Sequence, residues 1–296
     1  MSFEKKSLLE KRRLTLEELE KYYMELRKYN FENNVPLKNI EARKKIHMIL
    51  YRLIQLERIL SKEELHVIND KSIKTDNSIV YACTHIGGND IQRTFEAIKN
   101  HAYLFLGDPK ELYRDITGKI LFLNGDISFE TWNKEDRKIA YHRAIELLNK
   151  GGNLLIYPEG AWNVSENEPV MGLYKGAVKM AAETKSDIIP VALEQYDNKF
   201  FVNIGENMPY HALKSNDLDV RNIELRDNLA TLKWEIWETQ GINKRDIVAL
   251  EKDTFQQSIV DKCEYSFTLQ DVFDTMYHDP NKVSADEVFK VLKKVR

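Results

Sequence analysis

The spacing of apolar residues divides the chain into three parts, and the first part follows a helical period. Thr15-Leu16-Glu17-Glu18 is a capping box, which predicts the start of a helix. The apolar residues that follow fall on one helical face: Leu16, Leu19, Tyr23 and Leu26. The Asn33–Pro36 stretch interrupts this pattern, and a second helix is predicted over about residues 38–60. We expect both helices to pack on the main domain, as a hairpin, although their apolar faces also suit a lipid surface.

Between about residues 77 and 205 the pattern changes to short β-branched or aromatic runs that alternate with helical segments. The predicted strands are Ile79–Cys83, Ala102–Leu106, Ile120–Leu123, Asn153–Tyr157, Ile188–Leu193 and Phe200–Ile204. The predicted helices between them cover about residues 90–100, 133–150 and 173–184. This alternation predicts an α/β fold with a largely parallel β-sheet flanked by helices. A turn at Asp197-Asn198-Lys199 predicts a hairpin, so the sheet is expected to be mixed.

After about residue 213 the strand pattern ends and helical spacing returns. Apolar residues then repeat at helical intervals: Leu225, Leu229, Leu232 and Ile236. The tail, about residues 254–296, is polar with helical spacing. We therefore expect an N-terminal helical region (1–75), an α/β core (76–212) and a C-terminal helical region (213–296).

Charge and composition exclude several classes of protein. The 44 Lys and Arg nearly balance the 47 Asp and Glu, which gives no sign of a nucleic-acid-binding protein. Residues 1–75 hold 17 Lys and Arg against 12 Asp and Glu, which is typical of the solvated charges of a helical region and would also favour approach to an anionic membrane surface. Cys83 and Cys263 lie far apart without metal-ligand spacing, which fits a reducing compartment.

The apolar runs are too short to predict a membrane-spanning helix, and the first residues lack the apolar core of a signal peptide. We therefore expect a cytoplasmic protein, with peripheral attachment to the inner face of the cell membrane as an open alternative.

One histidine stands where a predicted strand ends. His85 follows the apolar run of residues 78–83, and Asp90 opens the next predicted helix. Gly87 and Gly88 let the chain turn back, so that Asp90 can hold one ring nitrogen of His85 while the other faces a substrate. A base oriented by a carboxylate activates hydroxyl groups. The spacing alone more often marks a turn histidine beside a helix-capping aspartate.

Two further stretches add to this candidate site. Residues 152–157 form an apolar strand pattern that runs into Pro158-Glu159-Gly160, and ligands of open α/β sheets bind at such strand ends. Glu159 can bind a polar acceptor there, and Gly160 allows close approach of the backbone. The apolar Ile188–Leu193 stretch suits the wall of a lipid groove or, taken alone, an ordinary core strand.

Taken together and in this order, the stretches resemble the motifs of the glycerophospholipid acyltransferase family. His85 and Asp90 match the first motif, His-x-x-x-x-Asp, and Tyr157-Pro158-Glu159-Gly160 matches the third. Ile189-Pro190-Val191 matches the fourth, and Lys175-Gly176-Ala177 resembles the family's Lys/Arg-Gly-Ala helix start. The resemblance covers roughly residues 77–205.

Two positions depart from the family pattern. The second motif normally ends in Asp-Arg, and we align it with Gly118–Gly125, so that Asn124 takes the acidic position and Gly125 replaces the arginine. The third motif often continues Thr-Arg-Ser, but Ala161-Trp162-Asn163 stands here. Both arginines that hold the acceptor phosphate in the family are therefore missing from this alignment. Lys175 is a candidate substitute, together with Lys119.

The resemblance implies transfer of a fatty acyl group from acyl-CoA or acyl carrier protein to a lysophospholipid or glycerol-phosphate hydroxyl. In this interpretation His85 is the base and Asp90 its orienting carboxylate, while Glu159, Gly160, Asn124 and Lys175 bind the acceptor. No metal or redox cofactor is implied. Two alternatives remain open: the same transfer to a glycan or polyol acceptor, and a non-catalytic lipid-binding relative.

Overall fold

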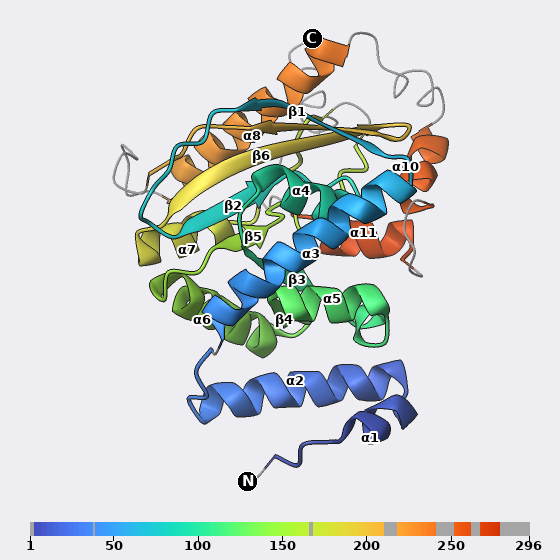
Figure 1. The fold of residues 1–296 in the computed structure, drawn as a ribbon, viewed down its shortest axis with the longest axis vertical. Helices are drawn as coiled ribbons and strands as arrows, with labels where there is room; N and C mark the ends of the chain where they lie inside the picture. The colour runs from blue at the N-terminus through green and yellow to red at the C-terminus, as the bar shows by residue number, and fades with distance from the viewer. Residues whose placement is uncertain are drawn as a thin grey trace, which may run out of the picture.

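The fold is built on a seven-stranded sheet with the order β1-β7-β6-β2-β5-β3-β4 (Figure 1). The computed structural model describes residues 3–37, 39–165, 168–209, 218–240, 252–261 and 267–278. The strands are β1 (Glu64–Asp70), β2 (Ile79–Cys83), β3 (Tyr103–Gly107), β4 (Asp126–Phe129), β5 (Leu154–Ile156), β6 (Asp187–Tyr196) and β7 (Lys199–Ile204). Five strands run parallel, whereas β7 pairs antiparallel with β6, and β1 runs parallel to β7. The predicted mixed, largely parallel sheet is confirmed, and so is the hairpin between β6 and β7.

Helices cover both faces of the sheet because side chains of each strand alternate between the faces. The helices that cover the sheet are α3 (Ile40–Leu60), α4 (Asp90–Ile98), α5 (Ile116–Asn124), α6 (Lys134–Asn149), α7 (Gly176–Thr184) and α8 (Leu218–Gln240). Val80 and Ala82 of β2 belong to a core cluster with α6, α7 and α8. Ile79, Tyr81 and Cys83 belong to a second cluster with α3, α4 and α5. Both faces of this strand are therefore buried, as its continuous apolar run predicts.

The N-terminal helices pack on separate parts of the domain. α1 (Leu8–Arg13) buries no residue, whereas α2 (Leu16–Glu32) buries Leu19 and Tyr22 and packs against α6. Arg27 of α2 donates hydrogen bonds to Asp136 and Glu130, which ties α2 to the core. α3 instead crosses the face of α4 and α5 (Figure 1). The predicted helices exist and pack on the main domain, but each packs on a different surface rather than as a hairpin.

One predicted strand was wrong. Ile120–Leu123 lies within α5, and the strand of this region is β4, which begins immediately after Gly125. The Asp115 side chain caps α5 by accepting from the Thr117 N–H at 2.8 Å, and Gly125 ends the helix with a positive φ of 119°. A short apolar run is compatible with a helix or a strand, and here the capping residues Asp115 and Gly125 favour the helix.

β1 was also missed, because it belongs to the segment predicted to be wholly helical. It lies at one edge of the sheet, none of its residues is buried, and most of them are polar, so that it lacks the apolar run of a core strand. At the other end, the structure describes α8, α10 (Lys252–Val260) and α11 (Leu269–Thr275). Residues 279–296 of the predicted C-terminal helical region lie outside the described residues.

Candidate active site

The turn between β2 and α4 holds a histidine and a carboxylate in contact. Nδ1 of His85 lies 2.7 Å from Oδ2 of Asp90, and the same oxygen accepts the N–H groups of Ile86 and Gly87 at 2.9 Å each. Gly87 and Gly88 make this turn with φ of +81° and +61°. Because Asp90 engages Nδ1, Nε2 is the ring nitrogen available to a substrate. The structure thus brings His85 and Asp90 together in the geometry of a base and its orienting group.

A cavity of about 960 Å³ opens in front of this turn. It collects the ends of four parallel strands, with His85 after β2, Asp108 after β3, Thr131 after β4 and Tyr157 after β5. This is the edge of an open α/β sheet at which ligands bind. Its lining is mostly apolar, with side chains from several elements: Ile91, Leu104, Phe105, Leu112, Leu121, Phe129 and Met180. Its size and lining suit a ligand with a long apolar part.

Aromatic side chains enclose His85. Its ring stacks on Tyr157 with the ring centroids 4.2 Å apart, and Trp162 meets it edge-on at 6.1 Å. Burial raises the pKa of the Tyr157 hydroxyl well above its usual value, so this ring stays neutral beside the histidine. The Trp162 ring in turn packs edge-on against Phe267, with the ring centroids 5.6 Å apart. The aromatic wall limits the directions from which a hydroxyl can reach Nε2.

Glu159 does not face the cavity. Its side chain is fully buried, and its two oxygens accept the N–H groups of His85 at 3.1 Å and Met171 at 2.9 Å. Burial raises the pKa of this carboxyl group, and the two N–H donors oppose that rise. The structure therefore uses both oxygens of Glu159 to hold backbone N–H groups, one of them that of His85, whereas the sequence predicts a role in acceptor binding.

Gly160 does line the cavity, with φ of +77°. A Cβ atom at this position would lie 2.4 Å from the Tyr174 ring and 2.9 Å from the Thr275 carbonyl oxygen. Gly160 is thus required by the approach of α11 as well as by the turn. The fourth motif lies in β6, where Ile189 and Pro190 are buried in the sheet, so these residues act as core rather than as a groove wall.

The second family motif had been aligned one element too early. The run Gly118–Gly125 is helical, whereas Gly125–Thr131 contains a strand, β4, that ends at the cavity. With this alignment Glu130 takes the acidic position and Thr131 stands where the family has arginine. Glu130 is buried and pairs with Arg27 at 3.0 Å. The absence of both customary arginines from the motifs therefore persists after realignment.

Neither Asn124 nor Lys175 lines the cavity. Asn124 is buried, its amide nitrogen donates to the Ala102 carbonyl at 3.0 Å, and its amide oxygen lies 2.7 Å from Nδ1 of His47. Lys175 is directed to an ion pair with Asp219. The structure thus uses Asn124 to fix α5 against the core and does not bring either residue to His85.

The charged lining of the cavity is unbalanced. Among the described residues that line it, Arg137 of α6 is the one arginine or lysine, and its guanidinium donates to the Thr131 carbonyl. Six residues with carboxylate side chains line the same cavity: Glu63, Asp90, Asp108, Glu111, Asp271 and Asp274. Sequence reasoning missed Arg137 because it lies outside every motif. Arg137 could have been found from its position, because it stands six residues after Thr131, in the first turns of the helix that follows β4.

The described residues contain no group of three or more His, Cys, Asp or Glu side chains arranged to hold a metal ion. None of the described helices is both long enough and apolar enough to cross a membrane.

Comparison with known proteins agrees with this architecture. Residues 64–194 match the family model described as Acyltransferase. Among solved structures, the chain is similar to the 1-acyl-sn-glycerophosphate (LPA) acyltransferase PlsC from Thermotoga maritima, with a TM-score of 0.54 and 16% sequence identity. That similarity covers 73% of this chain and 88% of the PlsC chain. The curated proteins give no match. The matched segment begins at β1 and contains His85, Asp90 and Glu159.

Proposed function

Because residues 64–194 match the family model described as Acyltransferase and the fold is similar to that of PlsC, we propose that the chain is a glycerophospholipid acyltransferase. In this proposal it moves a fatty acyl group from a thioester to the hydroxyl of a lysophospholipid or glycerol-phosphate-type acceptor. The donor is acyl-CoA or acyl carrier protein. The observation that carries this proposal is the contact between His85 and Asp90 at the mouth of an apolar cavity.

In the proposed reaction, Nε2 of His85 removes the proton from the acceptor hydroxyl as its oxygen attacks the thioester carbonyl carbon. The carbon–sulfur bond then breaks, and the imidazolium returns the proton to the departing sulfur, so that a free thiol leaves and His85 is again neutral. Asp90 stabilises that imidazolium and keeps Nε2 directed at the cavity. Gly88 and Asn89 line the cavity at the start of α4, so their N–H groups are candidates to stabilise the oxyanion.

Direct transfer fits the state of the cysteine beside the site. Cys83 is fully buried in β2, and burial raises the pKa of its thiol well above the ordinary value. A buried neutral thiol is a poor nucleophile. We therefore assign it to the core and propose no covalent acyl-enzyme intermediate.

A second candidate keeps the chemistry and changes the acceptor to a glycan or polyol without a phosphate. It is favoured by Thr131 and Trp162 at the two arginine positions and by a lining with six carboxylates against Arg137. Carboxylates repel a phosphate monoester and accept hydrogen bonds from hydroxyl groups. An indole such as Trp162 also offers an apolar face to a sugar ring.

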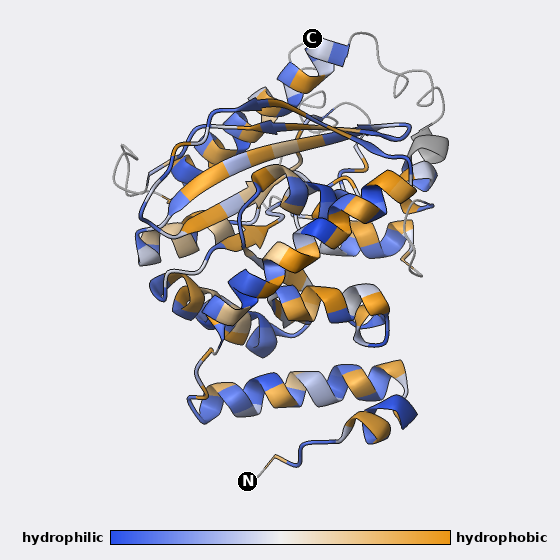
Figure 2. Cartoon of the chain, in the orientation of Figure 1, coloured by the Kyte–Doolittle hydropathy of each residue, from blue (hydrophilic) through white to orange (hydrophobic). Residues whose placement is uncertain are grey.

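We further propose that the protein works as a peripheral protein on the cytoplasmic face of a membrane, with α3 as the contact. The outward residues of α3 form an apolar stripe, here called the α3 stripe: Ile49, Leu53, Leu56 and Leu60, which are 50–72% exposed. Figure 2 shows hydrophobic stretches recurring along α3 between hydrophilic ones. Exposed Lys45 and Arg52 lie on the same helix. An amphipathic helix of this kind suits an anionic lipid surface.

Flotation with anionic vesicles tests the membrane contact. A double variant, Leu53→Glu and Leu56→Glu, is expected to lose vesicle binding while the fold remains. Ile223→Glu on α8 is the matched control, since Ile223 is 57% exposed on a helix of the opposite face. Equal binding by the wild type and the double variant would remove α3 from the proposal.

The proposed activity is tested with one labelled acyl donor and a mixed pool of acceptors, with the products identified by mass spectrometry. Products from lysophosphatidate or glycerol phosphate support the first candidate, and acylated polyols or glycans support the second. His85→Ala should reduce product formation by about 10³-fold or more, the scale of a lost general base. His66→Ala, at an exposed position of β1, is the control. If wild-type protein forms no acyl product with any donor, the non-catalytic lipid-binding alternative is favoured.

A further inference from the structure

The catalytic turn is anchored from outside by a side chain that no family motif contains. Gly87 and Gly88 have more backbone freedom than other residues, so this turn depends on hydrogen bonds to hold its shape. Asn89 occupies the N-cap position of α4, yet its side chain makes no capping hydrogen bond. Instead, its amide nitrogen donates to Oε1 of Glu63 at 2.9 Å. The residue next to Asp90 is therefore held by the segment that joins α3 to β1.

Glu63 holds α4 at a second point. Its other oxygen, Oε2, accepts from Nε of Arg93 at 2.8 Å. Arg93 is fully buried and lies one helical turn after Asn89, whose carbonyl accepts the Arg93 N–H at 3.0 Å. One carboxylate thus fixes both the N-cap residue of α4 and the first turn of the helix, which limits rotation of the helix start.

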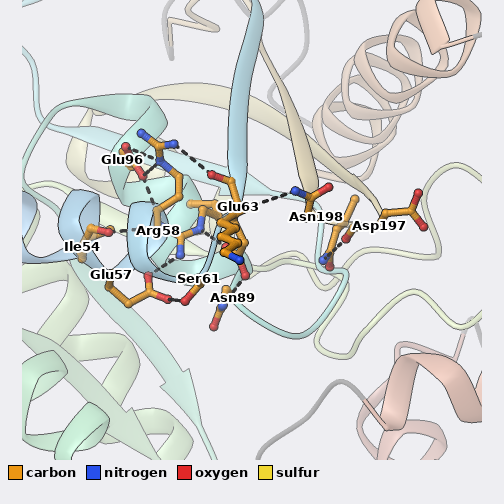
Figure 3. Close-up of polar contacts among 12 residues, drawn as sticks. Ile54, Glu57, Arg58, Ser61, Glu63, Asn89, Glu96, Asp197 and Asn198 are labelled. Carbon is orange, nitrogen blue, oxygen red and sulfur yellow. Dashed lines mark hydrogen bonds and ion pairs between the residues drawn. The ribbon is translucent and has the colours of Figure 1, made fainter.

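The rest of this cluster belongs largely to α3 (Figure 3). The Arg93 guanidinium also contacts Glu57 and Glu96, and Arg58 bonds both oxygens of Glu96 at 2.9 and 3.0 Å. Arg58 additionally donates to the Glu63 backbone carbonyl at 3.1 Å. A buried arginine needs such partners, because an unpaired buried charge is strongly destabilising. The polar side of α3 is therefore built around the helix that carries Asp90.

Glu63 itself is placed by the backbone of the junction. Lys62 adopts a left-handed conformation with φ of +56°, and its carbonyl accepts from the Asn198 side chain at 2.6 Å. The Glu64 N–H donates to the Asn198 carbonyl at 2.8 Å, where β1 begins beside β7. The β6–β7 turn and α3 thus hold the Glu63 backbone from two sides, and the Glu63 side chain lines the cavity.

We propose that Glu63 is a positioning residue, which acts through Asn89 to hold the His85–Asp90 pair in its reactive orientation. This inference rests on the proposed acyl transfer and adds two residues to its site. The hydrogen bond from Asn89 to Glu63 restrains the glycine turn. The hydrogen bond from Arg93 to Glu63 holds the Glu63 carboxylate in the position from which it binds Asn89. Displacing reacting groups by about 1 Å costs about 10²-fold in rate.

Asn89→Ala is the decisive variant, because it breaks the restraint and leaves the ion pair between Arg93 and Glu63 intact. We expect kcat to fall by about 10- to 100-fold, with KM for donor and acceptor within about twofold of wild type. Glu63→Gln keeps an acceptor for Asn89 and should retain more turnover than Glu63→Ala. Glu64→Gln, at the exposed neighbouring position, should behave as wild type.

A readout independent of turnover is the nuclear magnetic resonance of the labelled histidine rings, with His85→Ala used to assign the signal. Wild-type His85 should show one tautomer with the proton on Nδ1, bonded to Asp90. In Asn89→Ala, the His85 signal should show two tautomers in exchange. The unfolding temperature of this variant should stay within a few degrees of that of the wild type. Unchanged kcat together with an unchanged His85 signal in folded Asn89→Ala would overturn the inference. A different result would overturn the proposed function alone. In that case the wild type is inactive, but its His85 shows one tautomer and Asn89→Ala shows a mixture of two.

Discussion

Two buried carboxylates, Asp90 and Glu159, hold the same turn and have different roles. Asp90 is 1% exposed and Glu159 is fully buried, and both accept backbone N–H groups from residues 85–87. Only Asp90 also contacts the imidazole ring. The second oxygen of Glu159 accepts the N–H group of Met171. One carboxylate thus contacts the side chain of the proposed base, and the other contacts the backbone that carries it.

The difference shows that burial and residue type do not assign a role at such a site. A carboxylate that touches the ring can stabilise the charge formed during reaction, because the interaction strengthens in the transition state. A carboxylate that holds backbone N–H groups has the same partners before and after proton transfer. The two side chains should therefore separate when activity and stability are measured together.

The largest effect on turnover is expected for Asp90→Asn. Oδ2 of Asp90 makes all three contacts, so an asparagine carbonyl oxygen can take its place and only the charge is lost. We expect thiol release in the presence of acceptor to fall by about 10²- to 10⁴-fold with little change in acceptor KM. The control is Asp70→Asn on the exposed edge of β1. Near-wild-type turnover in folded Asp90→Asn would remove the distinction between the two carboxylates.

A smaller effect on turnover is expected for Glu159→Gln. Both oxygens accept N–H donors, and a glutamine can satisfy only one of them, so one N–H group would face the new NH₂ group. The free energy of unfolding should fall by about 1–3 kcal/mol, and turnover by about 10-fold or less, as expected for an indirect shift of the base. Denaturant titration and initial rates measure these two quantities. A selective rise in acceptor KM with unchanged stability would restore the acceptor-binding role predicted from the sequence.

The smallest effect on turnover is expected at His101, a buried histidine with no carboxylate partner. Its Nε2 donates to the Asn124 carbonyl at 2.8 Å, and Nδ1 has no partner among the described residues. Burial lowers the pKa of His101 to about 4, and the neighbouring His47, Lys44 and Arg43 add to this effect. His101 therefore stays neutral at neutral pH. It is a buried imidazole that, unlike His85, has no carboxylate to stabilise its protonated form.

The consequence is a pH dependence of stability. Between pH values of about 6.5 and 4 the unfolded chain binds a proton at residue 101 and the folded chain does not, so stability falls on acidification by an amount on the order of 3 kcal/mol. His101→Gln should flatten this slope and leave neutral-pH turnover within about twofold of wild type. His66→Gln is the exposed control. Burial raises the pKa of Glu130 to about 6, which contributes the opposite slope, so the variant is compared with wild type at each pH.

The sequence predicts those parts of the site that are local in the chain. His85 and Asp90 are five residues apart and meet through one turn, so their spacing was sufficient. Glu159 was found by its motif, but its direction depends on Met171 and on the sheet, which spacing does not encode. Glu63 and Arg93 are thirty residues apart in different elements, and no short pattern joins them. The error at α5 has a different cause, because its apolar run is compatible with a helix or a strand and the residues that decide, Asp115 and Gly125, are local in the chain.

The α3–β1 junction also determines which variants can separate the roles of the N-terminal part of this chain. A truncated chain without residues 1–75 would lose more than a lipid-binding surface. It would strip β1 from β7 and expose a new sheet edge that is open to self-association. It would also leave the Arg93 charge in the interior with Glu96 alone among its present acidic partners. The first quarter of the chain is thus not a detachable anchor, and an insoluble truncated protein would reveal nothing about membranes. Substitutions on the outer side of α3 separate the two properties that deletion would confuse.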